Sequence, residues 1–190
     1  MKNLFIDIET TGLDPQNHGI IQLSGIIEID KEVKDTFNYF IRPCSDDKID
    51  DKALEFNNLT REELKQDSRF RDPLIVYKEL ITLLSGYVDK FDRKDKFHFI
   101  GYNSQAFDFP FVRAWFYKCK DTYFGSWFWS PSVDVMTIWA YLLTAKRAQL
   151  NNFQLATVAK FIGINIDDSK VHDSMYDIEI TREMYHKIVV

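Results

Sequence analysis

The sequence has little cysteine and no long apolar run. Cys44 and Cys119 are the only two cysteines among 190 residues, and their separation fits no metal-binding motif. Two such thiols are typical of free cysteines in a reducing compartment. No stretch approaches the roughly 18 apolar residues of a membrane span, and the short apolar N-terminal run, which contains Asp7, does not resemble a signal peptide. We therefore expect a soluble, cytoplasmic protein that does not associate with membranes.

An excess of positive charge is also lacking. The formal net charge is -5 and the isoelectric point is about 5.4. This balance argues against a uniformly basic face for long duplex DNA, although it leaves room for a local basic patch. The length of 190 residues and the 45% hydrophobic content suit one domain with a sizeable core, so we expect a single domain over residues 1–190.

The apolar periodicity predicts an α/β fold. A period of two residues marks the first strand, and three successive strands suggest an antiparallel meander. Helical spacing and turn residues mark the later segments, among them a capping box at Thr60. These signals predict a mixed five-stranded sheet with helices on both faces. The expected strands cover residues 4–9, 19–29, 33–42, 97–103 and 132–135, and the expected longer helices cover 73–88, 106–118, 136–147, 153–162 and 173–188.

Two acids interrupt the first strand. In the stretch NLFIDIETTGL, Asp7 and Glu9 are two residues apart, so their carboxylates project from the same face of the strand. Two like charges at about 4 Å repel by roughly 1 kcal/mol in water and roughly 4 kcal/mol at an effective dielectric constant of about 20. A divalent cation relieves that repulsion, whereas a strand end in solvent explains the pair without any function.

Three further residues each suit either a functional site or an ordinary structural role. Asp108 lies in the apolar stretch IGYNSQAFDFPFV, and it suits either a metal ligand or an acid in the first turn of a helix. His172 and Asp177 lie in VHDSMYDIEI. They do not share a face of a regular helix, but a helix that starts near Asp173 or Ser174 allows both side chains to reach one point.

Together these three motifs strongly resemble those of the DnaQ-like 3′–5′ exonucleases, in the group with four acids and a histidine called DEDDh. The resemblance covers residues 3 to about 185 and implies an RNase H-like fold that binds two divalent metal ions, Mg²⁺ or Mn²⁺. It implies that Asp7 bridges both ions, that Glu9 and Asp177 complete one site, and that Asp108 acts at the other. It also implies that His172 is the general base.

The resemblance extends to substrate-binding positions. Thr10, Thr11 and Leu13 match residues that hold the terminal sugar and separate the last two bases, although Leu13 also suits a simple core contact. Asn103 and Phe107 flank the second motif, where Asn103 supports the active-site loop and Phe107 also suits the core.

Two other features are open to several interpretations. Asp134 resembles an acid at a strand-to-helix turn, where we expect a helix cap. The aromatic stretch from Trp115 to Trp129 suits packing against the sheet, stacking of unpaired bases or a partner surface.

The implied function is a metal-dependent 3′–5′ exonuclease that acts on single-stranded ends, with DNA proofreading or repair favoured. Its partners are then a single-stranded DNA or RNA 3′ end and a candidate polymerase or other replication or repair protein. RNA 3′-end trimming, as by RNase T or oligoribonuclease, remains an alternative because the sequence does not show how the 2′-hydroxyl is read. Two further alternatives are a catalytically inactive binding module and a nuclease of a mobile element or defence system.

Overall fold

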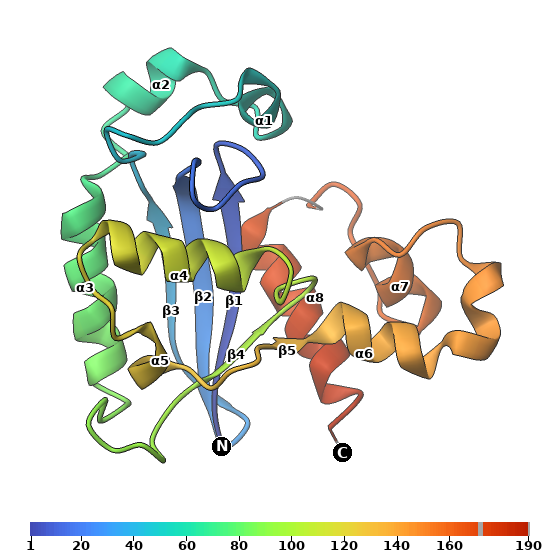
Figure 1. Ribbon diagram of the computed structural model, residues 1–190. Coiled ribbons are helices and arrows are strands. Elements are labelled where there is room, and N and C mark those ends of the chain that lie inside the picture. The colour runs from blue at the N-terminus through green and yellow to red at the C-terminus, as the bar shows by residue number, and fades with distance from the viewer. Residues whose placement is uncertain (171–172, 190) are drawn as a thin grey trace.

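A five-stranded sheet in the order β3-β2-β1-β4-β5 forms the centre of the protein (Figure 1). The computed structural model describes residues 1–170 and 173–189. The strands β1, β2 and β3 pair antiparallel, and β4 and β5 join parallel to β1, which confirms the predicted mixed sheet. The strands span Lys2–Thr10 (β1), Ile20–Ile29 (β2), Glu32–Phe40 (β3), His98–Gly101 (β4) and Val133–Asp134 (β5).

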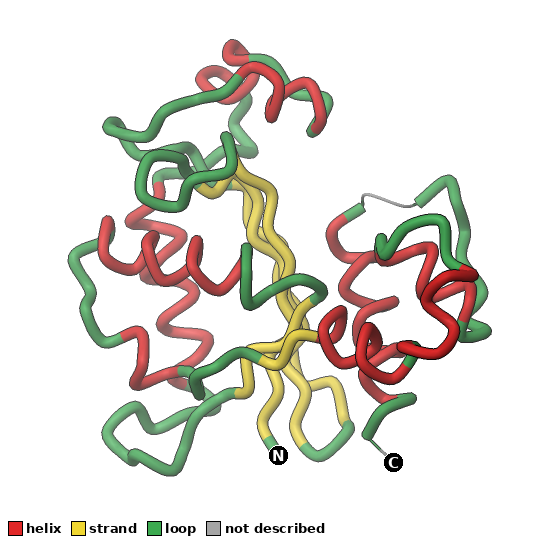
Figure 2. The backbone as a smooth tube through the Cα atoms, turned by 45° about the vertical axis from the view of Figure 1, so that its right-hand side comes forward, coloured by secondary structure: helices red, strands yellow, loops and turns green. Residues whose placement is uncertain are grey.

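Helices cover both faces of this sheet, as Figure 2 shows. One face packs against α3, Pro73–Ser85, and α4, Asp108–Lys118, together with the short α5, Phe124–Trp127. The other packs against α6, Val135–Leu142, α7, Leu155–Phe161, and α8, Ser174–His186. The predicted helix over 173–188 is thus α8, with Asp173 as its N-cap.

The helix predicted over 136–147 is wrong in its second half. The α-helix α6 ends at Leu142, and a 3₁₀ helix, η1, follows over Thr144–Gln149. None of the side chains of η1 is buried. Without an apolar face to pack, this segment lacks the tertiary contacts that stabilise most α-helices in proteins.

Two short helices lie beyond the end of β1, at the top of Figure 1. They are α1, Asp51–Phe56, and α2, Arg61–Gln66. The predicted capping box is present, because Thr60 and Glu63 each bind the other's backbone amide. A small core under these helices joins them to β2, and it contains Ile21, Leu54, Leu64 and Phe70.

Most of the aromatic stretch packs inside the protein, as one interpretation of the sequence expected. Phe116 contacts Phe124 edge to face, with ring centroids 5.1 Å apart. The aromatic stretch contains α5, because the buried rings of Phe124 and Trp127 anchor one helical turn there. The buried members are Trp115, Phe116, Phe124, Trp127 and Phe128, whereas Tyr117, Tyr123 and Trp129 reach solvent.

The two cysteines are free thiols, as predicted. Burial raises the pKa of Cys44 to about 11 and that of Cys119 to about 12, so both stay protonated near neutral pH. Among the helices of the described residues, none has the length and apolar character needed to cross a membrane.

Candidate active site

The strand β1 directs two acids toward the face of the sheet that α8 covers. Phe5 belongs to the core under α8, whereas its even-numbered neighbours belong to the core under α3 and α4. Asp7 and Glu9 follow Phe5 at intervals of two residues, so they project from the same face. The pairing of β1 with β2 is irregular between Glu9 and Thr10, where the strand ends and the next loop turns away.

The helix α8 brings Asp177 to the same place. At the far end of this helix, the ring of Tyr185 contacts Phe5 edge to face, with centroids 5.4 Å apart. Asp177 lies eight residues earlier, about 12 Å back along the helix axis, while Asp7 lies about 7 Å along the strand from Phe5. The helix and the strand therefore run side by side, with both carboxylates at the same end.

A buried hydroxyl pair fixes the start of α8. Ser174, the first residue of the helix, donates a hydrogen bond to the hydroxyl of Ser24, and both side chains are buried. Ser24 stands directly opposite Asp7 in the pairing of β1 with β2. This bond holds the first turns of α8, and Asp177 with them, next to Asp7.

Asp108 enters from the opposite side of the sheet, as the first residue of α4. The loop before it is held by Asp134, whose carboxylate accepts hydrogen bonds from the backbone amides of Asn103 and Gln105 at 3.1 and 3.3 Å. Asp134 also caps α6 by accepting from the amide of Thr137 at 3.2 Å, so the predicted helix cap is confirmed. Asn103 adopts a left-handed backbone conformation, φ +63°, which asparagine tolerates well.

The four carboxylates interact electrostatically. The pKa of Asp7 is raised well above its usual value by burial and then by the negative charges of Asp108, Glu9 and Asp177. Burial and the charge of Asp177 raise the pKa of Glu9 to about 7. Burial also raises the pKa of Asp108 to about 7, although hydrogen bonds from the backbone of Asp108 and Ile8 oppose the rise. Acids from three distant segments thus share one site.

The donor set suits a hard divalent cation. All four side chains offer carboxylate oxygens, and the raised pKa values of Asp7, Glu9 and Asp108 show that negative charge is costly there. In the part of the chain that the structure describes, no group of three or more His, Cys, Asp or Glu side chains is arranged so that the group alone could hold a metal ion. Water and substrate phosphate oxygens commonly complete the coordination of Mg²⁺, so a few carboxylates suffice to hold it.

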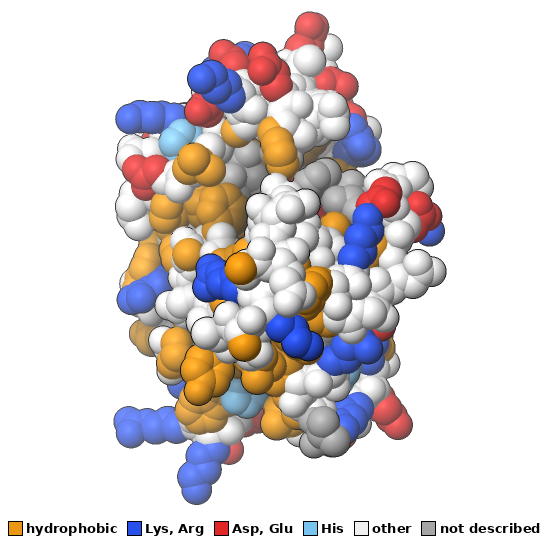
Figure 3. Space-filling model, turned by 90° about the vertical axis from the view of Figure 1, so that its right-hand side faces the viewer, with side chains coloured by type: hydrophobic (Ala, Val, Ile, Leu, Met, Phe, Trp, Pro, Cys, Tyr) orange, Lys and Arg blue, Asp and Glu red, His pale blue; other side chains and the backbone are white. Residues whose placement is uncertain are grey.

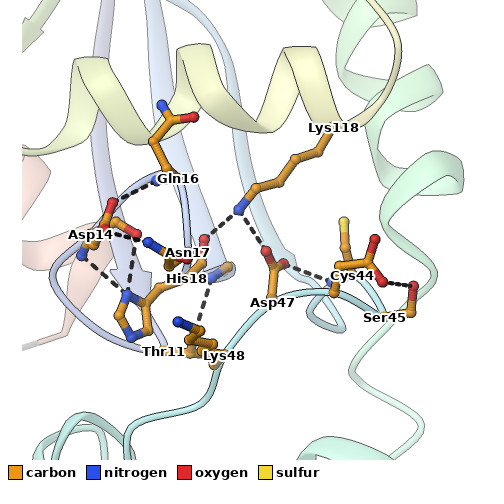
Figure 4. Close-up of polar contacts among 12 residues, drawn as sticks. Thr11, Asp14, Gln16, Asn17, His18, Cys44, Ser45, Asp47, Lys48 and Lys118 are labelled. Atoms are coloured by element: carbon orange, nitrogen blue, oxygen red, sulfur yellow. Dashed lines mark hydrogen bonds and ion pairs between the residues drawn. The ribbon is translucent and has the colours of Figure 1, made fainter.

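The loop after β1 is braced from two sides, as Figure 4 shows. Lys118, at the end of α4, donates hydrogen bonds to the backbone carbonyl of His18, at 2.6 Å, and to the carboxylate of Asp47. The hydroxyl of Thr11 donates to the carbonyl of Lys48 at 2.7 Å. Residues 11–19 are therefore fixed against the segment 44–48 and α4.

Close packing also restricts this loop. A Cβ atom at Gly12 would lie 2.3 Å from the imidazole ring of His18, so any larger residue there would have to displace that ring. Thr10 donates its hydroxyl to the carbonyl of Gly12 at 2.7 Å, and its side chain is buried. The side chains of Thr10 and Thr11 thus shape the loop.

Leu13 stands at the tip of this braced loop with 84% of its side chain exposed, so the alternative of a core contact is wrong. It borders a cavity of about 420 Å³ that Glu9, Thr10, Phe56 and Phe107 also line. Phe107 lines this cavity and also packs against the core, as one interpretation of the sequence expected. Glu9 and Phe56 line an adjacent cavity of about 230 Å³ as well.

The remaining predicted site residue, His172, lies outside the described residues. Two features of this site were not predicted from the sequence: Phe56, which is 67% exposed beside Glu9, and the brace formed by Lys118 and Asp47. The one signal for Phe56 in the sequence was an aromatic residue at the end of a short, mostly polar segment, which forms α1.

The sequence profile of the exonuclease family matches residues 4–185. The chain is 23% identical over 184 residues to a PolC-type DNA polymerase III of Thermotoga petrophila, a match that covers 97% of the chain but 12% of the relative. It is 25% identical over 193 residues to Ribonuclease T of Buchnera aphidicola, covering 97% of the chain and 82% of that relative. The chain thus spans about an eighth of the polymerase and most of the ribonuclease.

Solved structures share this fold. Exonuclease I of E. coli in complex with a dT13 oligonucleotide superposes with a TM-score of 0.77 at 20% identity, covering 98% of this chain and 40% of that one. A zinc-bound form of the same enzyme with single-stranded DNA gives a TM-score of 0.75 at 21% identity. At these identities the similarity shows the fold, an α/β fold of the RNase H-like class that the sequence motifs predicted.

Proposed function

Because the chain belongs to the exonuclease family, in its DnaQ-like group, we propose that it is a metal-dependent 3′–5′ exonuclease acting as one domain over residues 1–190. It releases nucleoside monophosphates from the 3′ ends of single-stranded nucleic acid, with DNA favoured. The observation that carries this proposal is the electrostatic coupling of Asp7 with Glu9, Asp108 and Asp177. A group of buried like charges is costly to maintain, and such groups cluster at functional sites.

In this proposal the carboxylates hold two divalent ions, Mg²⁺ or Mn²⁺. When bound, such ions activate water, neutralise the phosphate and stabilise the leaving oxygen. Asp7, Glu9 and Asp177 would hold the ion that supplies the attacking water, and Asp7 with Asp108 would hold the other. His172 takes the proton from the attacking water, for which its reference pKa of about 6.5 is suited at neutral pH.

The braced loop after β1 holds the terminal nucleotide. Leu13 projects into solvent beside the cavity next to Glu9, where it can insert between the last two bases. Backbone groups of Thr10 and Thr11 contact the terminal sugar. Phe107 lines the same cavity, and Asn103 supports the loop that precedes Asp108.

The preference for DNA rests on the structural relatives, since Exonuclease I is seen with single-stranded DNA oligonucleotides. Proofreading or repair, with a polymerase or other replication protein as partner, is consistent with the similarity to the PolC-type polymerase. The similarity to Ribonuclease T favours RNA 3′-end trimming as the second candidate.

One assay separates these functions. DNA and RNA oligonucleotides of the same sequence, labelled at the 5′ end, are incubated with the protein in Mg²⁺, in Mn²⁺ and in EDTA. A ladder that shortens from the 3′ end, requires metal and is absent for Asp7→Asn supports the nuclease, and the ratio of DNA to RNA rates decides between the two substrates. Absence of cleavage under every condition would leave only a binding role.

A further inference from the structure

The loop between α3 and β4 lies at the opposite end of the sheet from the carboxylates. Residues 89–96 of this loop are at the bottom of Figure 1, near α5. Lys2, at the start of β1, donates hydrogen bonds to the carbonyl of Tyr87 and to the carboxylate of Asp95, which holds the loop against this end of the sheet. Asp7 lies five residues further along β1, about 17 Å away. A ligand of this loop is therefore remote from the candidate active site.

Three aspartates fix the shape of the loop. Asp89 accepts a hydrogen bond from the backbone amide of Phe91 at 3.0 Å, and Asp92 accepts one from the amide of Lys94 at 2.8 Å. Asp95 accepts from the amide of Asp89 at 3.0 Å. A loop held in one shape by its own side chains pays little ordering entropy when it binds a ligand.

Lys90 lies between two aromatic rings. Its ammonium nitrogen is 5.4 Å from the ring centroid of Phe91 and 5.7 Å from that of Trp127. The ring of Phe91 is 85% exposed, whereas Trp127 is buried, and its backbone carbonyl accepts a hydrogen bond from the amide of Phe97 at 2.9 Å. In the described part of the chain Lys90 forms no ion pair, so its charge is available to an anion.

A cavity of about 440 Å³ surrounds this lysine. Residues 85–91 and Trp127 line it, and it shares no lining residue with the two cavities beside Glu9. Its volume is within the range of small-molecule sites in proteins. The indole N–H of Trp127 is buried and has no hydrogen-bond acceptor among the described residues, which is a polar group that a ligand oxygen or nitrogen would satisfy.

Charge at this end of the protein favours an anion. On the face that Figure 3 draws, Lys and Arg side chains project at the lower edge, whereas most acidic side chains lie toward the top. The loop contributes Arg93 and Lys94, which are both exposed. Cations beside an exposed aromatic ring are suited to nucleotides, because the ring stacks on a base and the cation pairs with a phosphate.

We propose that the cavity between Phe91 and Trp127 is a nucleotide-binding site separate from the carboxylates. The base stacks on the ring of Phe91, in the position that the ammonium group of Lys90 now occupies, and this ammonium group pairs with the phosphate. Asp89, which also lines the cavity, accepts a hydrogen bond from the amino group of adenine or cytosine. The ligand is thus an adenine or cytosine nucleotide, either as a free monophosphate or within a single strand.

The test measures binding without catalysis. Binding of 2′-deoxyadenosine 5′-monophosphate is measured by titration calorimetry in EDTA, beside 2′-deoxyadenosine, which lacks the phosphate. A labelled deoxyadenosine octanucleotide, followed by fluorescence anisotropy, represents the strand. The variants are Phe91→Ala and Lys90→Met. Lys94→Met is the matched control for charge, since it lies in the same loop but outside the cavity, and Phe56→Ala removes an exposed ring beside Glu9.

We expect Phe91→Ala to weaken binding of the monophosphate by at least about fivefold, since stacking of one base contributes about that much or more. Lys90→Met should lower the affinity for the monophosphate toward that for the nucleoside and should leave the nucleoside affinity within about twofold of wild type, because only the phosphate contact is lost. Both control variants should bind the monophosphate within about twofold of wild type, because neither side chain lines this cavity.

The two ligands distinguish the two sources of the nucleotide. Weaker binding of the monophosphate by Phe91→Ala assigns the site to free nucleotides, and weaker binding of the octanucleotide alone assigns it to a strand. Wild-type protein that binds neither ligand overturns the inference. Affinities that Phe91→Ala leaves unchanged, or that only Phe56→Ala lowers, overturn it as well, since binding then takes place elsewhere.

This inference goes beyond the proposed function, because no carboxylate of the candidate active site takes part in it. A protein that binds the monophosphate through Phe91 but cleaves nothing contradicts the proposed function alone. A protein that cleaves but shows no binding through Phe91 contradicts this inference alone. Because Phe91 is largely exposed, Phe91→Ala should fold normally, and a thermal unfolding curve matching that of wild type excludes misfolding as the cause of a loss.

Discussion

Ser174 donates a hydrogen bond to Ser24, and Ser24 stands opposite Asp7 across two paired strands. The bond joins residues 150 positions apart in the chain, and both side chains are buried. It therefore sets the position of the first turn of α8 relative to the central strand. Since Asp177 lies in that turn, the distance between two proposed metal ligands depends on a pair of hydroxyl groups that touch neither substrate nor metal.

Replacing Ser24 with alanine should lower both stability and kcat. The hydroxyl of Ser174 would remain buried without its acceptor, which costs about 1–3 kcal/mol. The double variant Ser24→Ala/Ser174→Ala should be less destabilised than the sum of the two single variants, because neither hydroxyl is then left alone. Thermal unfolding and kcat at saturating Mg²⁺ measure the two effects. Strict additivity of the unfolding free energies would show that the bond contributes nothing.

Without divalent ions, protonation of Glu9 should couple stability to pH. Its pKa is about 7 in the folded protein against an ordinary value of 4.5, so between these values the folded state holds a proton that the unfolded state has lost. The contribution to stability is complete below about pH 4.5 and is lost as the pH rises through 7.

Added Mg²⁺ should therefore raise the melting temperature more at pH 8 than at pH 5. Melting curves in EDTA and in Mg²⁺ across this range measure the difference. Asp7→Asn should flatten the trend and reduce cleavage by about a thousandfold, or roughly 4 kcal/mol of transition-state stabilisation. An equal Mg²⁺ effect at both pH values would contradict the assignment of these carboxylates.

Breaking the brace behind the loop should weaken substrate binding more than it slows chemistry. Lys118→Met removes the hydrogen bonds to the carbonyl of His18 and to Asp47, whose side chain is only 3% exposed. The loop that carries Leu13 then loses its support, and we expect KM to rise about tenfold, or 1.4 kcal/mol, with a small change in kcat. Lys34→Met, which breaks the exposed pair with Glu32, is the control and should leave KM unchanged.

Leu13 should affect activity without affecting stability. Its side chain is 84% exposed, so Leu13→Ala removes little buried surface and should leave the melting temperature within about 1 °C, since exposed substitutions rarely change stability by more than 0.5 kcal/mol. If the side chain separates the last two bases, cleavage of oligonucleotides should fall severalfold. An unaltered rate would remove Leu13 from the substrate site.

Glu28 should be the strongest stabilising charge away from the site. Its side chain is fully buried and accepts hydrogen bonds from Arg182 at 2.6 Å and Asn3 at 3.2 Å, with His186 at 2.8 Å. Burial alone would raise its pKa, but these three partners outweigh burial and lower the pKa below its usual value. The stabilisation is therefore present above pH 4.5 and is lost as the pH falls through the lowered value.

Glu28→Gln should cost about 3–5 kcal/mol near neutral pH, because it leaves Arg182 without its buried partner. The difference from wild type should shrink as the pH falls below 4. Urea unfolding at several pH values measures this, with the exposed Glu32→Gln as control. A constant difference down to low pH would show that packing, and not charge, is responsible.

Local periodicity was enough to predict the strand that carries Asp7 and Glu9, because alternation depends only on neighbouring residues. It also placed the start of α8 near Asp173, where a side-chain cap ends the preceding loop. The pairing of Ser24 with Ser174 and of Asp47 with Lys118 could not be predicted, because ordinary polar residues give no signal of partners 150 and 71 positions away. The end of α6 was missed because its apolar pattern continues past Leu142 to the buried Leu143, whereas no side chain of η1 beyond it is buried.

The position of α8 has a consequence for how the protein is made. In synthesis, Asp177 follows Asp7 only after 170 further residues. Until α8 docks, the carboxylate cluster is incomplete and the sheet surface around Phe5 lacks its cover of Tyr185 and Met184. A nascent chain that has not yet folded α8 thus lacks the proposed metal site and exposes an apolar sheet surface that chaperones recognise.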